Sequence, residues 1–431
     1  MKILVVGPGA REHAIVHALT AEAASGDAHE IHAAPGNPGI AAQATLHAVD
    51  AEDGAAVTAV AREIGADLVV VGPEAPLVAG VGDALREAGF PVFGPGGEAA
   101  RLEGSKAFAK EVMAAAGVPT AMAHVCTDLD EVAAALDAFG APYVVKDDGL
   151  AAGKGVVVTR DRDAALEHAR TALDARGDAG RVVVEEYLDG PEVSLFCVCD
   201  GTAVVPLAPA QDFKRVFDGD EGPNTGGMGA YSPLPWAPPG LVDEVVSRVA
   251  QPTVDEMARR GTPFSGVLYC GLALTSRGLR VVEFNARLGD PETQSVLARL
   301  VTPLSRVMLA AARGELADLG LLRWRDEAAV TVVVASAGYP ESSRKGDPIT
   351  GIVDAEESAG VHVLHAGTGL SDDGALVAAG GRVLSVVALG ADLTAARDKA
   401  YEAVGKISLA GSQHRTDIAA KAAAGTLTVP A

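Results

Sequence analysis

The first hundred residues alternate short β-branched runs with helix-like stretches, and this alternation constrains the fold more than any other feature. The runs KILVVG, EIHAAP, DLVVVGPE and PVFGP predict strands, and the segments between them predict helices, the first beginning near Arg11. Strands that alternate with helices form a parallel sheet with right-handed crossovers. We therefore expect a small parallel α/β domain at the N-terminus.

Glycine- and proline-rich turns follow three of these strands. They are GPGAREHA at 7–14, PGNPG at 35–39 and GPEAPL at 72–77. Ligands of open parallel sheets bind outside the carboxyl ends of the strands, so the three turns predict one crevice. Glu12 stands where a dinucleotide fingerprint has its third glycine, and no acid follows the second strand. A nicotinamide cofactor is therefore disfavoured, and a tight turn without a ligand is the alternative for GPGAREHA.

The composition is typical of a packed globular protein. The chain has 431 residues, 48% of them hydrophobic, which is enough for about two to four domains. Its formal charge of −22 argues against nucleic acid as a partner, because a phosphate backbone binds to a basic face. The N-terminal hydrophobic run is too short for a signal peptide, and the longest uncharged stretch, 222–242, is broken by Gly and Pro. We expect a cytoplasmic protein that binds neither nucleic acid nor membranes.

The cysteines and histidines predict no covalent or metal-dependent catalysis of their own. Cys126, Cys197, Cys199 and Cys270 form no C-x-x-C pair, so neither a disulfide framework nor a zinc site is indicated. Buried free cysteines are the expected outcome. The histidines are scattered, and no arrangement typical of a protein nucleophile appears.

The stretch DDGLAAGKGVVV at 147–158 has the glycines and lysine of a nucleotide-binding loop at the wrong spacing. A P-loop continues from its lysine to a hydroxyl residue, whereas Lys154 is followed by Gly155. PYVVK before it and GVVVTR after it predict strands, which indicates a glycine hairpin. Such a hairpin can fold over a polyphosphate, with charge from Lys146 and Lys154. A mobile turn without a ligand is the alternative.

Two neighbouring segments fit a nucleotide site around this hairpin. A helix is expected over 98–116, and it carries Lys106. The segment EEYLDGPE follows a predicted strand and could present backbone groups to an adenine edge and a carboxylate to ribose hydroxyls. Its candidate residues are Glu185, Glu186, Leu188 and Glu192. A solvated acidic turn is the alternative interpretation.

The stretch VVEFNARLGDPETQ at 281–294 is the most informative. Glu283, Asn285 and Arg287 alternate, so on a strand they would point to one face. Unpaired charges are costly in an apolar core. Around a Mg²⁺ nucleotide, the oxygens would bind the hard cation and the guanidinium a phosphate. An exposed strand face is the alternative.

A long glycine-rich loop adds a candidate substrate site. GPNTGGMGAYSP at 222–233 is preceded by Asp212 and Lys214. Loops of this length in compact proteins are usually functional or mobile. The loop could wrap a small substrate.

Taken in order, these motifs resemble the phosphoribosylamine–glycine ligase family of ATP-grasp enzymes over essentially the whole chain. The resemblance is carried by GPGAREHA, APGNPG, VGPEAPL, LEGSKAFAK, DGLAAGKGV, GPNTGGMGAYSP, EFNARLGDPETQ, HAGT, GGRVL and RTDI. GPNTGGMGAYSP and GDPETQ are specific to that family. The resemblance implies an α/β and α+β multidomain protein. It would have a Rossmann-like substrate-binding domain at 1–101, an ATP-grasp domain at 102–324 with a mobile glycine-loop lid at about 120–190, and a small α/β domain at 325–431.

The resemblance also assigns roles to individual residues. It implies catalytic roles for Arg287 and Lys154. ATP would be bound by Lys106, Lys146, Gly153, Lys154, Gly155, Glu185, Glu186, Leu188 and Glu192. The substrates would be bound by Gly9, Arg11, Asn37, Glu74, Asp212, Lys214, Thr225, Gly226, Gly227, Met228, Arg287 and Asp290. The metal ligands would be Glu283 and Asn285. The sequence departs from the family pattern at Pro8, Ala10, Asp147, Phe213, Ala286 and Leu288.

The implied reaction is an ATP-dependent ligation in purine biosynthesis. Glycine would be joined to 5-phosphoribosylamine through glycyl phosphate, with Mg²⁺ or Mn²⁺, by a protein expected to be a monomer. Another ATP-grasp carboxylate–amine ligase is the alternative within this fold. A non-catalytic nucleotide sensor is the alternative of another functional class, and a nicotinamide dehydrogenase is a third alternative that the missing acid after the second strand disfavours.

Overall fold

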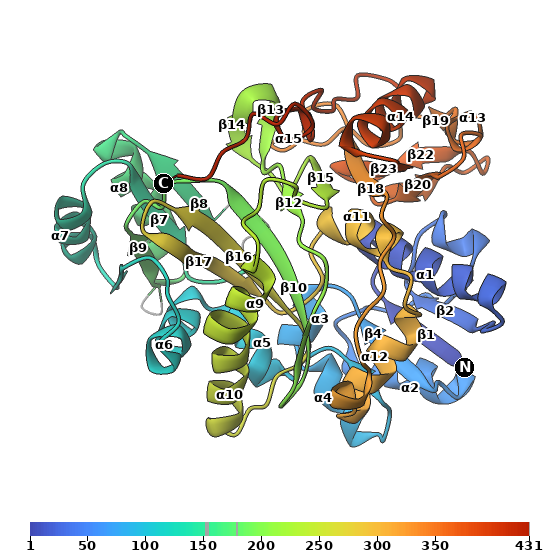
Figure 1. Cartoon of the computed structure of the whole chain (residues 1–431), viewed down its shortest axis with the longest axis horizontal. Coiled ribbons are helices and arrows are strands. Elements are labelled where there is room, and N and C mark those ends of the chain that lie inside the picture. Colours follow the sequence, from blue (N-terminus) through green and yellow to red (C-terminus); the bar gives the residue numbers. More distant parts are fainter. Residues whose placement is uncertain (151–154, 178–179, 431) are drawn as a thin grey trace.

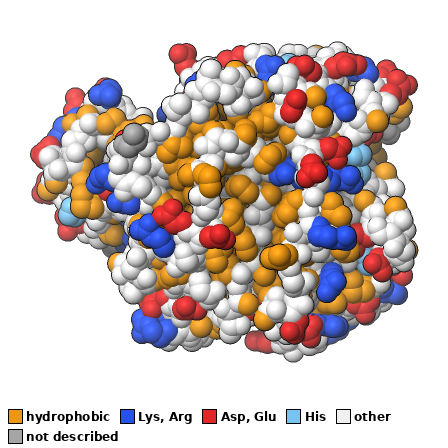
Figure 2. All heavy atoms as spheres, viewed as in Figure 1, with side chains coloured by type: hydrophobic (Ala, Val, Ile, Leu, Met, Phe, Trp, Pro, Cys, Tyr) orange, Lys and Arg blue, Asp and Glu red, His pale blue; other side chains and the backbone are white. Residues whose placement is uncertain are grey.

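The computed structural model describes residues 1–150, 155–177 and 180–430. Four main sheets organise these residues: an N-terminal sheet, a lid sheet, a central sheet and a C-terminal sheet. Figure 1 shows the lid at the left, the central sheet in the middle, and the N- and C-terminal sheets at the right. In Figure 2 the lid projects as a separate lobe, and hydrophobic side chains gather across the middle of the same face.

The N-terminal sheet is fully parallel, with the strand order β3-β2-β1-β4-β5. Its strands are β1 (Lys2–Val6), β2 (Glu30–Ala34), β3 (Thr45–Leu46), β4 (Leu68–Val71) and β5 (Val92–Phe93). Its helices are α1 (Ala10–Ala21), α2 (Gly54–Ile64), α3 (Glu74–Val78) and α4 (Val81–Glu87). The alternation in the sequence is thus confirmed as a parallel α/β unit, and the three glycine-rich turns follow β1, β2 and β4.

The single helix expected over 98–116 is wrong, because the chain forms two helices there. α5 (Gly97–Gly104) and α6 (Lys106–Ala116) are separated by Ser105, whose backbone is extended. The Ser105 hydroxyl accepts a hydrogen bond from Phe108 N and so caps α6. The break places Lys106 in the first turn of the second helix.

The lid sheet is antiparallel and has its own hydrophobic core. Its strands are β6 (Ala123–Cys126), β7 (Tyr143–Asp147), β8 (Val156–Thr159) and β9 (Val182–Glu185), in the order β6-β9-β7-β8. The helices α7 (Leu129–Phe139) and α8 (Arg162–Asp174) pack on it. Val132, Leu136, Val145 and Val184 belong to a cluster that contains only lid residues. The lid is therefore packed as a unit.

The central sheet is antiparallel, with the order β11-β10-β16-β17. Its strands are β10 (Glu192–Asp200), β11 (Val204–Pro206), β16 (Ser265–Thr275) and β17 (Gly278–Asn285). The accompanying helices are α9 (Leu241–Val245), a π-helical turn at Val246–Ala250, α10 (Gln251–Arg259), α11 (Glu292–Arg299) and α12 (Leu304–Arg313). Cys197, Cys199 and Cys270 are buried in this sheet as free thiols, as expected.

The C-terminal sheet includes two strands from the middle of the chain. Its order is β12-β15-β18-β23-β20, and every pairing is antiparallel. β18 (Ala328–Ala335), β20 (Val361–His365) and β23 (Arg382–Gly390) come from the C-terminal third, whereas β12 (Gln211–Asp212) and β15 (Gly229–Ser232) precede α9. The loop GPNTGGMGAYSP is therefore continuous with this sheet.

Smaller elements complete the chain. The helices are α13 (Ile352–Glu356), α14 (Leu393–Lys406) and α15 (Ala420–Ala423), and the short strand pairs are β13 (Arg215–Phe217) with β14 (Glu221–Asn224), β19 (Ile349–Thr350) with β24 (Ser408–Leu409), and β21 (Thr368–Leu370) with β22 (Leu376–Ala378). Single-turn helices lie at Glu22–Ser25, Ile40–Ala42, Asp218–Asp220 and Leu316–Asp318. Among the helices described here, none is long and apolar enough to cross a membrane.

Candidate active site

The main cavity has a volume of about 1160 Å³ and lies where the four main sheets meet. The lid, β10, β17, the turns of the N-terminal unit and the start of β23 all contribute to its walls. Many of the residues singled out from the sequence line it: Arg11, Glu74, Lys106, Lys146, Gly155, Glu185, Glu186, Leu188, Glu192, Asp212, Lys214, Thr225, Gly226, Glu283, Asn285, Arg287 and Asp290. Segments far apart in the sequence therefore share one cavity.

Four of the singled-out residues are not among those that line the cavity: Gly9, Asn37, Gly227 and Met228. Gly9 N donates to Glu12 Oε2 at 2.6 Å. Met228 is fully buried, and a Cβ on Gly227 would come within 2.4 Å of a Pro291 carbon. Gly153 and Lys154 lie outside the described residues.

The Asn37 side chain makes four hydrogen bonds to other parts of the chain. Its Nδ2 donates to Pro8 O at 2.8 Å and to His365 O at 2.9 Å. Its Oδ1 accepts from Gly39 N and Ile40 N. The side chain therefore joins the first glycine turn to the end of β20.

Lysines gather on the lid side of the cavity. Lys106 Nζ donates to Gly149 O at 3.1 Å, and burial lowers the pKa of Lys106 while Glu283 opposes this shift. Lys146 Nζ lies 2.8 Å from Glu185 Oε2 and donates to Val282 O at 2.9 Å. Lys146 thus links the lid to β17 at the point where the nucleotide phosphates were expected.

Both carboxylate oxygens of Glu186 have partners at the edge of the lid. Its Oε1 accepts from Met122 N at 3.0 Å, and its Oε2 lies 2.8 Å from Arg277 Nη2. Burial raises the pKa of Glu186, but the hydrogen bonds from Met122 and Arg277 outweigh it, and the net shift is downward. Leu188 and Glu192 line the cavity beyond it.

Glu283 and Asn285, the two oxygen ligands expected from the sequence, lie at the end of β17. Burial raises the pKa of Glu283, but Lys214, Lys146 and Lys106 together lower it below its usual value. No hydrogen bond joins the Asn285 side chain to another residue that the structure describes. An ionised carboxylate and an amide oxygen suit a hard divalent cation, so these residues fit the metal implied by the resemblance. The described residues contain no cluster of three or more His, Cys, Asp or Glu side chains able to hold a metal by themselves.

Arg287 does not continue the strand, which corrects the expected alternation of three side chains. β17 ends at Asn285, and the pairing between β16 and β17 is irregular near Glu283. Arg287 still lines the cavity, because two carboxylates hold it there. Its Nη2 lies 2.8 Å from Glu103 Oε1, and its Nε lies 3.2 Å from Glu74 Oε2.

These two carboxylates respond differently to the same guanidinium. Burial raises the pKa of Glu103, and Arg287 only partly opposes it. Burial also raises the pKa of Glu74, but the positive charges of Arg287 and Arg11 outweigh burial and bring this pKa down to about 2. Glu103 was missed by the sequence reasoning, since a single acid in the helix of LEGSKAFAK carries no pattern of its own.

Asp212 and Lys214 share the opposite wall. Lys214 Nζ lies 2.6 Å from Glu192 Oε2 and 3.8 Å from Glu283 Oε1. Burial raises the pKa of Asp212 to about 8, against the opposing charge of Lys214. The Asp212 carboxyl group can therefore hold a proton near neutral pH.

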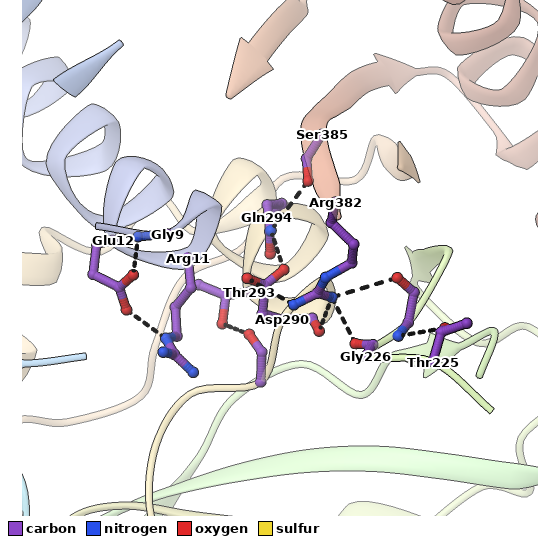
Figure 3. Close-up of polar contacts among 12 residues, drawn as sticks. Gly9, Arg11, Glu12, Thr225, Gly226, Asp290, Thr293, Gln294, Arg382 and Ser385 are labelled. Atoms are coloured by element: carbon purple, nitrogen blue, oxygen red, sulfur yellow. Dashed lines mark hydrogen bonds and ion pairs between the residues drawn. The ribbon is translucent and has the colours of Figure 1, made fainter. Parts of the chain in front are cut away.

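Arg382 fastens the loops that carry Gly226 and Asp290 to the C-terminal sheet (Figure 3). Its Nη1 donates to Gly226 O at 2.6 Å and to Asp290 O at 2.7 Å, and its Nη2 lies 3.3 Å from Asp290 Oδ2. Gln294 Nε2 donates to Asp290 Oδ1 at 2.9 Å. The Asp290 carboxylate is thus held from both sides. GGRVL was noted in the sequence, but nothing in it singled out Arg382.

Comparisons with known proteins agree with this geometry. Models of the phosphoribosylglycinamide synthetase N domain, ATP-grasp (A) domain and C domain match residues 1–103, 104–293 and 329–421. A phosphoribosylamine–glycine ligase from Streptomyces coelicolor is 71% identical over 425 residues, which cover 98% of this chain and 100% of that protein. The chain belongs to the phosphoribosylglycinamide synthetase family.

Solved structures support the same assignment. The crystal structure of the phosphoribosylamine–glycine ligase from Thermotoga maritima aligns with a TM-score of 0.82 and 32% identity, covering 97% of this chain and 100% of that one. The biotin carboxylase domain of the Hydrogenobacter thermophilus 2-oxoglutarate carboxylase, solved with MgADP, aligns with a TM-score of 0.72 over 96% of this chain and 91% of that one. Its 18% identity shows a shared fold alone. The ATP-grasp assignment itself comes from the family model that matches residues 104–293.

Proposed function

We propose that this chain is an ATP-dependent ligase of purine biosynthesis that joins glycine to 5-phosphoribosylamine. The products would be glycinamide ribonucleotide, ADP and phosphate. The observation that carries the proposal is the convergence of Lys106 and Lys146, the Glu283–Asn285 pair and Arg287 on one cavity. Membership of the synthetase family supports the same reaction.

The reaction would take place in two transfers. A carboxylate oxygen of glycine attacks the γ-phosphorus of ATP, the bond to the β–γ bridging oxygen breaks, and glycyl phosphate and ADP form. The amine of 5-phosphoribosylamine then attacks the acyl carbon, and the carbon–oxygen bond to phosphate breaks as the amine loses a proton. Both nucleophiles come from substrates, so the protein contributes positioning and charge stabilisation.

The lid side of the cavity would hold the nucleotide. Lys106, Lys146 and Lys154 would contact phosphates together with the backbone of Gly153 and Gly155, while Glu186, Leu188 and Glu192 would face the adenosine. Arg287, fixed by Glu74 and Glu103, would stabilise the phosphoryl group in transfer with Lys154. Lid closure would keep water from the acyl phosphate.

The opposite walls would hold the two other substrates. The lining residues proposed for them are Arg11, Glu74, Asp212, Lys214, Thr225, Gly226, Arg287 and Asp290. Gly9, Asn37, Gly227 and Met228 would shape these walls from behind. The cytoplasmic location and the monomeric state expected from the sequence stay predictions.

Glu283 and Asn285 would hold Mg²⁺ or Mn²⁺ together with the nucleotide phosphates. A divalent cation there would neutralise charge on the phosphate oxygens. Lys106, Lys146 and Lys214 keep Glu283 ionised, so the carboxylate would be ready to bind at neutral pH.

The test is a coupled assay of ADP release in which one substrate is omitted at a time. ADP production should require ATP and glycine, and sustained turnover should also require 5-phosphoribosylamine. Release that depends on a different acid or amine would indicate another ATP-grasp ligase. ATP binding without ADP release that depends on glycine would indicate a sensor and would reject the proposal.

A further inference from the structure

We propose that Lys110 is a positioning residue for the nucleotide phosphates, and that it acts through Glu185 on Lys146. The inference rests on the proposed function only in that the nucleotide binds in this cavity. The three residues come from α6, β9 and β7. Glu185 lies between the two ammonium groups, with Oε1 at 3.0 Å from Lys110 Nζ and Oε2 at 2.8 Å from Lys146 Nζ.

Lys110 has no hydrogen left for a ligand. Its Nζ also donates to Thr120 Oγ1 at 2.9 Å and to Ala121 O at 3.1 Å. With Glu185, these contacts use all three donors of an ammonium group. Lys110 also lines the cavity, but because its three donors are already paired within the protein, it acts on a nucleotide through its neighbours.

Among the residues that the structure describes, only two groups accept hydrogens from Lys146 Nζ. Glu185 and Val282 O accept two of its three hydrogens. The side chain is buried but lines the cavity. The remaining hydrogen is available to a phosphate oxygen.

The charges of the three groups explain why a second lysine is needed. The Glu185 carboxylate is almost fully buried, so its charge is weakly screened by water. Paired with Lys146 alone, it would cancel the charge that attracts phosphate. Lys110 supplies a second positive charge, and the group as a whole presents one net positive charge to the cavity. The resemblance implies that Glu185 binds the adenosine. In this arrangement Glu185 instead pairs with Lys110 and Lys146.

A structural role for Lys110 makes a different prediction. Thr120 Oγ1 donates to Val281 O, so Lys110 also helps to hold the segment that leads from α6 into the lid. If this were its only role, its loss would weaken the binding of every adenine ligand alike. The loss would also be independent of the charge on Glu185.

The experiment compares ADP with adenosine, which has no phosphates, by calorimetric titration of the full chain. Lys110→Met should weaken ADP binding by about tenfold and change adenosine binding by less than about twofold. Adding Glu185→Gln restores the original net charge, so the double variant should regain ADP affinity to within about threefold of the unmodified protein. Lys345→Met removes an exposed charge outside the cavity and should leave both affinities unchanged.

Two results would overturn the inference. One is an equal loss of ADP and adenosine affinity in Lys110→Met; the other is a double variant that binds ADP no better than Lys110→Met. If Lys110→Met does not fold, Glu185→Gln alone decides, because it raises the net charge of the group by one. Tighter ADP binding with unchanged adenosine affinity supports the inference, and ADP binding that is unchanged or weaker rejects it. Failure of the unmodified chain to bind ADP would instead count against the proposed function.

Discussion

Glu283 keeps its negative charge in a partly buried position because lysines surround it. We expect Glu283→Ala to lower kcat by at least about a hundredfold, the usual cost of removing a group that stabilises transferring charge. The fold should persist, since the side chain faces the cavity. Steady-state ADP release measures the effect, and Glu63→Ala, an exposed acid on α2, is the matched control. Turnover by Glu283→Ala at the rate of the unmodified chain would exclude this role.

Asn37 should matter for stability more than for direct contact with substrate. Asn37→Ala leaves the carbonyls of Pro8 and His365 and the amides of Gly39 and Ile40 without their present partner. We expect the free energy of unfolding to fall by about 2–3 kcal/mol, because unsatisfied buried polar groups are costly. Urea denaturation measures it. A change below about 0.5 kcal/mol, the size typical of surface substitutions, would contradict the role.

The site residues that could be predicted from the sequence are those that form patterns. The alternation of Glu283 and Asn285 predicted a shared face, and both side chains line the cavity. Glu103, Lys110 and Arg382 were missed. Each is a single charged residue in an ordinary helix or at the start of a strand, and its meaning depends on partners far away in the chain.

The break between α5 and α6 was not predicted from the sequence. LEGSKAFAK holds a local sign of the break in Gly104 and Ser105, which was passed over. The tertiary contact at the break lies in the lid, where Asp148 Oδ1 accepts from Ser105 Oγ at 2.9 Å. Ser105→Ala removes both this bond and the cap on Phe108 N. We expect the protein to lose about 1–2 kcal/mol of stability, the cost of a lost cap. Thermal unfolding measures it; Ser105→Asn should retain most of the capping, and equal losses in both variants would contradict the explanation.

The contact between α1 and β20 should make the protein sensitive to acid. His13 and His365 lie in edge contact, His17 and His362 lie with ring centres 4.2 Å apart, and His13 Nδ1 accepts from His365 N. Burial, followed by neighbouring histidines, lowers the pKa of His13 to about 3 and of His17 to about 4, and burial lowers that of His365 to about 4.

These histidines favour the folded state at neutral pH and lose that effect as the pH falls. Below the usual pKa of about 6.5, the unfolded chain binds protons that the folded chain does not, so stability decreases from about pH 6.5 toward pH 4. We expect on the order of 1–2 kcal/mol for each histidine between pH 7 and pH 5. Urea denaturation across this range measures it. His17→Gln should have a shallower pH dependence, and an identical slope would contradict the assignment.

Over the whole molecule, the parallel N-terminal sheet was predictable and the composition of the C-terminal sheet was not. The strand–helix alternation is local, so it can be read from a continuous stretch of residues. β12 and β15 join β18 across about a hundred intervening residues, and no local period signals such a pairing. The irregular end of β17 before Arg287 was missed for the same reason, because the carboxylates that hold the arginine lie on α3 and α5.

The shared sheet predicts that the C-terminal third cannot be removed cleanly. In a fragment of residues 1–324, β15 loses its pairing with β18, and the hydrophobic residues that β18 and β23 cover lose that cover. An unpaired strand edge with exposed hydrophobic residues promotes aggregation. We expect the fragment to elute as aggregate in size-exclusion chromatography, with the full chain as control. A monomeric fragment with one cooperative thermal transition would contradict this view.

The lid, in contrast, keeps a hydrophobic cluster made only of its own residues. A unit that carries its own packing can be inherited or exchanged without redesign of the remaining scaffold. A lid of residues 120–190 from a relative should therefore be accepted by the remaining domains, and it would bring the positions of Glu186 and Leu188 with it. On this view, selection can change the lid side of the nucleotide site of such an enzyme without changing the walls that bind its acceptor.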